Sequence, residues 1–564
     1  MKRLSLLMLI ALTGSMLIQS CKSGDKSGLQ VPKDAAFVLH INNTSLSGKL
    51  TWDEIKATNW FKEASTEADQ KDTLLQSLLQ NPDNSGIESK ADMVLYVKKQ
   101  GRGTYVAFQG TLKDLAAFEA FNKKAFKEST SAKDGNATVI NLKDNAIAYA
   151  EGTKFIYIID APMGNFAGAM MRSGGSYEPY KFPVDSLKSF AKANLTVSGK
   201  NSLGSDDRFA DLMKTPGDVH MWIDNEQYMG MLGGDMLGML KVTDVIKGVA
   251  AGYTISFDNG KINMEAKSYL NDQLASLFKK YPPKKISSDV INRIPSQNVV
   301  AVFAMNYPPE GLKEFVKLTG LDGWADGFLR EMNYSVDEFI KANKGDLVIS
   351  VSDLEIKKEE VTYPGYDGGA PYKYTKTTPD MKVVFATSVN DKAAFDKMIS
   401  TLASKMPANQ TGMPSISYQI TKDWFVASNS ADYVNKFMAG GNSKLPFASK
   451  LDGQSLGMYV DIQKILQSSK TGSTDSTANK AIDHSLAMWQ DMLMLGGEYK
   501  DGKWTSHMEI NLVDKTTNSL KQLNQYIDKM HAAMKRPKYA DADVDGPIIV
   551  DTTVTVAPPT AAEK

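Results

Sequence analysis

The sequence is nearly without cysteine, and its charges cancel. Cys21 is the one cysteine among 564 residues, so no disulfide can form within the chain. A chain of this length does not need one, because the fraction of surface that folding buries rises with size. The 65 basic and 65 acidic side chains leave no net charge, whereas nucleic-acid-binding proteins usually carry a basic excess. We therefore expect no nucleic acid among the partners.

Long hydrophobic runs are also scarce. The one long run covers residues 4–18 and follows Lys2 and Arg3; it is too short for a membrane span but typical of a secretory signal peptide. It leads into "LIQSC", which ends at Cys21 and resembles the cleavage box of bacterial lipoproteins, with Gln19 where a smaller residue is usual. The resemblance implies a diacylglycerol on Cys21 and a third acyl chain on its new amine, and therefore a stable membrane anchor. An ordinary signal peptide with an incidental cysteine is the alternative.

The rest of the chain divides into segments of different composition. We predict a signal peptide over 1–20, a flexible leader over 21–30, related repeats over 31–285 and 286–535, and a disordered tail over 536–564. The tail is rich in Asp, Thr, Pro and Ala and has little to bury.

The two repeats are predicted from five pairs of similar segments that occur in the same order. The pairs are 31–50 with 294–315, 89–97 with 343–351, 104–121 with 381–398, 217–224 with 454–461, and 257–270 with 499–513. In the last pair, Asn259-Gly260 and Asp501-Gly502 separate alternating strands and predict type I′ hairpin turns. Meandering strands with interspersed helices predict an α+β fold, in which each half is a mostly antiparallel sheet covered by helices.

The leader, the segment "VPKDA" at 31–35 and the duplicated layout together resemble an uncharacterised family of Bacteroidota lipoproteins, a domain of unknown function. The resemblance covers nearly all of the chain after the signal peptide. It implies a cell-envelope location and this fold, and it supplies no catalytic residues.

Enzyme-like motifs occur only in unfavourable contexts. "GQSLG" (453–457) matches G-x-S-x-G, but a helix-like segment precedes Ser455 and a strand follows, the reverse of a hydrolase nucleophile elbow. "SFAK" (189–192) and "KTG" (470–472) resemble motifs of penicillin-binding enzymes, yet the KTG lies in a stretch with the composition of a polar loop. The five histidines show no paired spacing, so no zinc enzyme is expected; they are His40, His220, His484, His507 and His531.

Two segments contain residues that could bind a metal ion, and each has a simpler interpretation. Asp541, Asp543 and Asp545 alternate as in a calcium loop, but the twelfth position lacks the expected Glu, so a solvated acidic linker is the alternative. The run 221–242 is rich in methionine and places Met229, Leu232, Met236 and Leu240 on one helical face. That face predicts a helix packed on the sheet; an adaptable binding surface or a Cu(I) site are alternatives. We expect no cofactor.

A hairpin over 361–380 is longer than its first-half counterpart over 98–104. It adds Tyr363, Tyr366, Tyr372 and Tyr374 around Gly and Pro. Exposed tyrosines offer flat contact area for a protein or a sugar ring, so these four are the candidate partner-binding residues. A decorated loop without a binding role is the alternative.

The sequence therefore predicts a lipid-anchored cell-envelope protein with a noncatalytic binding or structural role and a protein or glycan partner. The alternative is an envelope hydrolase acting on glycan or peptide. A hydrolase should show a pocket lined by paired titratable groups, and a binding module an exposed apolar or aromatic patch. We expect the outer membrane, on its periplasmic face, because Asp25 is the one acidic residue in the leader whereas surface-export signals carry several.

Overall fold

The computed structural model describes residues 30–67, 81–142, 145–161, 180–237, 242–331, 333–363, 372–405, 416–441, 443–473 and 475–534. Within these ranges the strands form one 18-stranded sheet. The strands of the N-terminal half are β1 (Phe37–Ile41), β2 (Met93–Gln100), β3 (Gly103–Thr111), β4 (Thr130–Asp134), β5 (Ala137–Leu142), β6 (Ala146–Glu151), β7 (Lys154–Asp160), β8 (Val219–Asp224), β9 (Ala250–Asp258) and β10 (Lys261–Tyr269). Those of the C-terminal half are β11 (Val299–Asn306), β12 (Asn343–Tyr363), β13 (Tyr372–Val389), β14 (Ser417–Ile420), β15 (Trp424–Ser428), β16 (Leu456–Asp461), β17 (Trp489–Lys500) and β18 (Lys503–Leu512).

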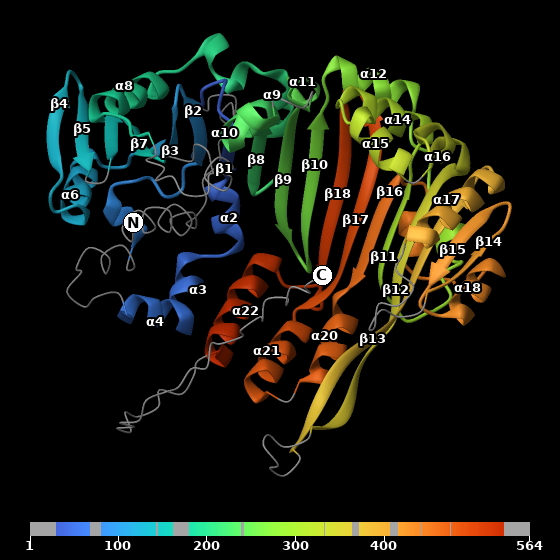
Figure 1. Ribbon diagram of the computed structural model, residues 1–564. Helices are drawn as coiled ribbons and strands as arrows, with labels where there is room; N and C mark the ends of the chain where they lie inside the picture. Colours follow the sequence, from blue (N-terminus) through green and yellow to red (C-terminus); the bar gives the residue numbers. More distant parts are fainter. Residues whose placement is uncertain are drawn as a thin grey trace, which may run out of the picture.

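Every pairing between these strands is antiparallel. From edge to edge the order is β4-β5-β6-β7-β3-β2-β1-β8-β9-β10-β18-β17-β16-β11-β12-β13-β15-β14. The two halves of the chain meet at the pairing of β10 with β18 (Figure 1). The order β7-β3-β2-β1-β8-β9-β10 on one side of that pairing has the same connectivity as β15-β13-β12-β11-β16-β17-β18 on the other.

Helices connect the strands and cover the sheet. In the first half they are α2 (Asn43–Lys49), α3 (Trp52–Lys56), α4 (Asn59–Glu67), α6 (Leu115–Ala125), α8 (Val184–Leu195), α9 (Asp207–Lys214), α10 (Asn225–Leu237), α11 (Val242–Ile246) and α12 (Asp272–Lys280), with short 3₁₀ turns η2 (Pro82–Ser85), η3 (Gly199–Asn201) and η4 (Leu203–Ser205). In the second half they are α13 (Ser288–Ile291), α14 (Pro309–Leu318), α15 (Asp322–Glu331), α16 (Val336–Ala342), α17 (Lys392–Lys405), α18 (Ala431–Met438), α19 (Ala448–Leu451), α20 (Ile462–Gly472), α21 (Ser476–Leu486) and α22 (Ser519–Met534). The fold is thus α+β, as the sequence predicts.

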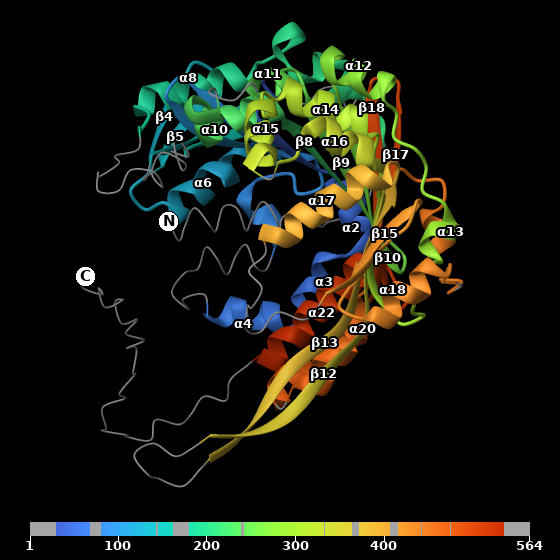
Figure 2. The ribbon, with the colours of Figure 1, turned by 45° about the vertical axis from the view of Figure 1, so that its right-hand side comes forward.

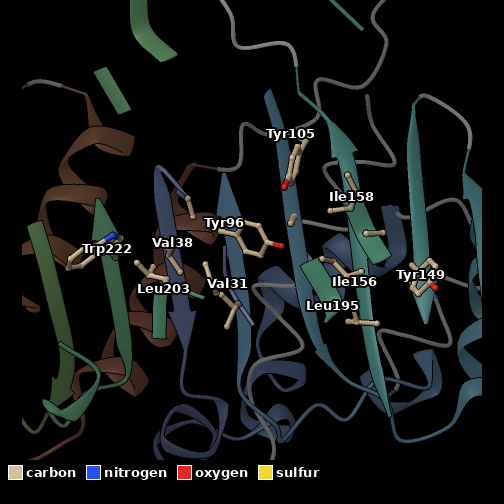
Figure 3. Packing of buried hydrophobic residues seen from close by; sticks show 14 of the residues in the cluster. Val31, Val38, Tyr96, Tyr105, Tyr149, Ile156, Ile158, Leu195, Leu203 and Trp222 are labelled. Carbon is tan, nitrogen blue, oxygen red and sulfur yellow. The ribbon is translucent and has the colours of Figure 1, made fainter. Parts of the chain in front are cut away.

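The two faces of the sheet are covered by different helices. The face that carries Val38, Trp222 and Val302 is called face A here; α8 and α9 cover it in the first half, and α13, α18 and α19 in the second. Figure 3 shows side chains of the first of these cores spread over neighbouring strands. The opposite face, which carries Leu39 and Phe303, is called face B. Its outer parts are covered by α6 and α17, and α2 to α4 lie at one end of it (Figure 2).

Alternation of side chains explains why single strands serve both faces. In β11 the residues at positions 300, 302 and 304 are buried on face A, whereas Ala301, Phe303 and Met305 on face B are only partly buried. Successive side chains of a strand point to opposite faces, so a strand with apolar residues at every position contributes to two apolar surfaces.

The two predicted hairpin turns differ. Asp501 and Gly502 both have positive φ, of 52° and 78°, which confirms a type I′ turn. Gly260 has a φ of 69°, but Asn259 is not in the left-handed region, so the prediction of type I′ is wrong there. Contacts with a distant loop accompany the difference: Asn259 forms a bridge with Asn518, and the amide of Gly260 donates to Thr517 O at 3.0 Å.

Across the described ranges, no helix combines the length and hydrophobicity needed to cross a bilayer.

Candidate functional site

A row of apolar side chains crosses face B through both halves of the chain. The residues are cross-strand partners on eight consecutive strands from β9 to β13, and we call them the methionine row: Ile255, Met264, Met508, Met494, Met458, Phe303, Ile349 and Phe385. None of the eight is fully buried, and Phe385 is 38% exposed. Neighbouring strands lie about 4.8 Å apart, so seven steps make the row about 34 Å long.

A second apolar row lies beside the first on the same face. Its members are Phe257, Ile262, Ile510, Met492, Val460, Ala301 and Val351, each again in register with the next. All seven are partly exposed. Soluble proteins seldom leave contiguous apolar surfaces uncovered unless something binds there. Methionine is flexible and polarisable, which suits it to surfaces that adapt to a ligand.

Face A of the same central strands is polar. A cavity of about 360 Å³ there has a polar lining that includes Asp258, Lys261, Glu265, His507 and Glu509, together with residues 215–216 just after α9 and Leu495 of β17. The acidic groups have partners: Glu265 lies 3.4 Å from Lys267 Nζ, and Glu509 lies 3.5 Å from Lys261 Nζ. The central strands are therefore charged on face A and apolar on face B.

One carboxylate, that of Asp211, interacts with strands of both halves at their junction. Asp211 on α9 accepts hydrogen bonds from Lys503 of β18 at 2.8 Å and from the Tyr269 hydroxyl at 3.0 Å, and lies 3.3 Å from Lys267 Nζ. Burial raises the pKa of Asp211, but the hydrogen bonds from Lys503 and Tyr269 and the charge of Lys267 outweigh it and lower the pKa to about 2.

A smaller apolar pocket lies between α14, α15 and α16, and we call it the helical pocket. It has a volume of about 240 Å³ and is lined by Leu312, Lys313, Val316, Trp324, Ala325, Phe328, Leu329, Val336, Phe339 and Ile340. Trp324 and Phe328 stand at its mouth, 71% and 53% exposed, with their rings stacked at 5.8 Å between centroids. The one charged lining residue, Lys313, pairs with Asp337.

Two histidines of the sheet form a buried contact rather than an open site. His40 and His220 are cross-strand partners on β1 and β8, each 1% exposed, with their Nδ1 atoms 3.1 Å apart. The outer ring nitrogens face Asp92 Oδ2 at 3.1 Å and Thr215 O at 2.7 Å. All four ring nitrogens are thus engaged. In the described part of the chain, no group of three or more His, Cys, Asp or Glu residues is arranged to hold a metal ion.

The enzyme-like motifs do not come together. Ser455 precedes β16, and its Oγ donates to Gly497 O at 3.1 Å, so it stands in a turn that leads into a strand. The prediction of a loop for Lys470–Gly472 is wrong, because these residues end α20, which Asp461 caps at its start. Residues 189–192 lie on α8 in the other half of the molecule (Figure 1).

The tyrosine-rich hairpin is present as a long arm. β12 and β13 continue beyond their neighbours in the sheet and pair with each other as far as Tyr363 and Tyr372, with Tyr374 opposite Val361 (Figure 1). Ion pairs such as Lys357–Asp380 lie along it. A partner-binding role for these tyrosines stays a prediction. Tyr366 lies outside the described residues, as do Cys21 and the calcium candidates Asp541, Asp543 and Asp545.

Neither the methionine row nor the helical pocket was predicted from the sequence. The alternation of Met492 and Met494 in β17, and of Met264 in β10, was visible, but their alignment depends on a strand order that joins residues more than 200 positions apart. The signal for the helical pocket was the aromatic spacing of Trp324 and Phe328 in one short helix.

The sequence matches a family model described as a domain of unknown function (DUF4836) over residues 30–520. No curated protein matches it. A solved structure titled "Structure of crystal form III of TP0453" is similar over 46% of this chain and 89% of its own, with 10% sequence identity and a TM-score of 0.24. That TM-score is too low to establish a common fold.

Proposed function

We propose that this chain, which belongs to the DUF4836 family, is a lipid-anchored envelope protein that binds an elongated apolar ligand without catalysing a reaction. The observation that carries the proposal is the partly exposed methionine row on face B. The hydrocarbon core of a bilayer is about 30 Å thick, so one acyl chain spans about 15 Å and fits within a row of about 34 Å. Acyl chains, or other flexible apolar chains, are therefore the ligand class.

The anchor is the acylated Cys21, and the membrane is the outer membrane, with its periplasmic face favoured. The support is the run at 4–18 followed by "LIQSC" and a leader with one acidic residue. Cys21→Ser should move the protein from the detergent-rich to the aqueous phase in phase partitioning. Retention of the variant in the membrane fraction would contradict the anchor. Protease treatment of intact and lysed cells separates the faces, with cleavage only after lysis expected.

We further propose that the two halves arose by duplication. Five pairs of similar segments occur in the same order, and the strands they form occupy corresponding positions on either side of the β10–β18 pairing. In this view the methionine row spans the junction because each half brings the same central strands to it.

Ligand binding can be tested with a fluorescent fatty acid as the probe. The double variant Met494→Gln, Met508→Gln keeps the side-chain length and replaces two thioethers by amides, which lose hydrogen bonds to water when an apolar chain covers them. We expect at least a tenfold weaker affinity. Glu509→Gln is the matched control, because it is the neighbour of Met508 on β18 and points to face A. Equal affinities of the double variant and the control would contradict the proposal.

A second candidate is an envelope hydrolase acting on glycan or peptide. The observation in its favour is the polar cavity on face A, which gathers Glu265, Glu509 and His507. Release of soluble fragments from peptidoglycan or casein, abolished by Glu265→Gln or Glu509→Gln, would support it. If the wild-type protein releases no fragments, the hydrolase function is contradicted and the binding function is retained.

A further inference from the structure

The helical pocket is too small for a whole ligand of the usual kind. Small-molecule sites enclose about 300–1,000 Å³, whereas this pocket encloses about 240 Å³ and opens between two exposed aromatic rings. A water molecule takes about 30 Å³, so the pocket equals about eight waters, the space of a few apolar side chains. Its size therefore suits anchor residues that project from a larger partner.

The first half of the molecule shows what covers such a surface. There α22 lies across α3 and α4, and Leu520 packs in one cluster with Trp52, Ile55 and Phe61. The Trp60 indole donates to Asn524 Oδ1 at 3.3 Å. An amphipathic helix therefore closes the helical connection that lies between β1 and β2.

The helix at the corresponding position beside α14, in the second half, is α12, and it is shorter than α22. α12 follows β10 as α22 follows β18, but α12 has 9 residues against 16 in α22. It packs on α14, where Leu274 and Leu318 share a small cluster, and ends at Lys280. A difference of 7 residues is about 10 Å of helix. Trp324 and Phe328 of α15 are exposed.

The charge around the helical pocket indicates which kind of helix it would bind. Where α22 packs on the first-half helices, Lys521 lies 2.6 Å from Glu54, and His531 Nδ1 lies 3.6 Å from Glu63. The segment 309–342 has seven acidic and four basic residues, a net charge of −3. Asp322 and Asp326 are exposed beside Trp324, and they form no ion pair among the described residues. A net negative rim favours a basic partner over an anionic membrane surface.

We propose that the helical pocket is the docking site for an amphipathic helix of another protein, with apolar residues anchored around Trp324 and Phe328 and basic residues facing Asp322 and Asp326. Binding of an amphipathic helix by a hydrophobic groove is a common mode of recognition. The site is separate from the methionine row, so the two proposals stand or fall independently.

The probe is an 18-residue leucine/lysine peptide that folds as an amphipathic helix, labelled with fluorescein and titrated with the full chain in a fluorescence anisotropy assay. Comparison peptides are a scrambled sequence of the same composition and a leucine/glutamate helix. We expect the leucine/lysine helix to bind at least tenfold more tightly than either. Trp324→Ala should weaken it at least tenfold, because exposed tryptophans at the centre of an interface carry much of the binding energy. Asp322→Lys with Asp326→Lys should weaken it as well.

Tyr418→Ala is the matched control, since Tyr418 is an aromatic residue 52% exposed on β14, outside the pocket. Circular dichroism of Trp324→Ala checks that the variant is folded, which its exposure predicts. The proposal would be overturned by equal binding of the lysine and glutamate helices, by equal effects of Trp324→Ala and Tyr418→Ala, or by Trp324-dependent binding to vesicles of anionic phospholipid in place of peptide. Dimerisation that Trp324→Ala abolishes would assign the pocket to a second copy instead.

Discussion

Replacement of Asp211 by asparagine tests how firmly the two halves are joined. The Asp211 carboxylate on α9 forms ion pairs with Lys267 of β10 and Lys503 of β18, so it links both sides of the β10–β18 pairing. Asparagine keeps the size of the side chain and removes the charge. We therefore expect Asp211→Asn to lower the free energy of unfolding without altering the fold.

The size of the effect follows from the pKa of Asp211. Its pKa falls from 3.8 to about 2 on folding. A shift of one unit corresponds to about 1.36 kcal/mol, which gives about 2.4 kcal/mol at neutral pH. Asp211 is 38% exposed, and solvent screens such a pair, so we expect about 1 kcal/mol. A carboxylate with a lowered pKa stabilises the folded state above its unfolded pKa, and this stabilisation is lost as the pH falls through about 4 to about 2.

Urea unfolding at pH 7, 5 and 3, followed by tryptophan fluorescence, measures the difference between wild type and Asp211→Asn. We expect it to be constant between pH 7 and 5 and to be about halved at pH 3. Asp207→Asn on the same helix is the control, because Asp207 is exposed and forms no ion pair in the described part of the chain. A difference that is absent at pH 7, or that grows as the pH falls, would refute the reasoning.

Other positions give simpler tests. Asp218 is fully buried and accepts from Lys49 Nζ at 2.6 Å, so Asp218→Ala should cost about 3–5 kcal/mol in urea unfolding, and a loss below about 1 kcal/mol would contradict its role. Gly345 has a φ of 110°, and a Cβ there would meet Tyr307 O at 2.0 Å, so Gly345→Ala should cost more than about 1 kcal/mol and lower Tm measurably; an unchanged Tm would count against this. Met494 should be oxidised by dilute peroxide faster than Met488, which is 4% exposed, in peptide mass spectra; equal rates would mean that the methionine row is covered.

Local patterns predicted the strands well. Alternating apolar residues around Asp501-Gly502 predicted two strands and their turn, and β17 and β18 are there. Local sequence could not predict the turn at Asn259, whose backbone conformation accompanies contacts with residues 517 and 518, far along the chain. The fold class can be predicted from local sequence, because the spacing of apolar residues within each strand and helix reflects which of its faces is buried. Strand order cannot, because it depends on pairing between segments far apart in the chain.

The candidate sites were harder to predict for the same reason. The run 221–242 is rich in methionine, yet the methionines that align across the sheet come from four different strands. Register of antiparallel strands decides which side chains become neighbours, and a shift of one residue would move them to the other face. The exposure of Trp324 depends on which elements pack beside α15, and no local pattern in the sequence determines that.

The methionine row needs both halves of the molecule. Ile255 and Met264 come from the first half, and the other six residues come from the second, so the full length of the row exists only where β10 pairs with β18. A separated half would also expose β10 or β18 as an unpaired edge, and long edge strands promote association between chains. If the halves arose by duplication, an ancestral single unit could have satisfied that edge by pairing β10 with the same strand of a second copy. Fusion would then have freed the two halves to diverge, and they now differ in the length of the helix after the last strand and in the length of the β12–β13 arm.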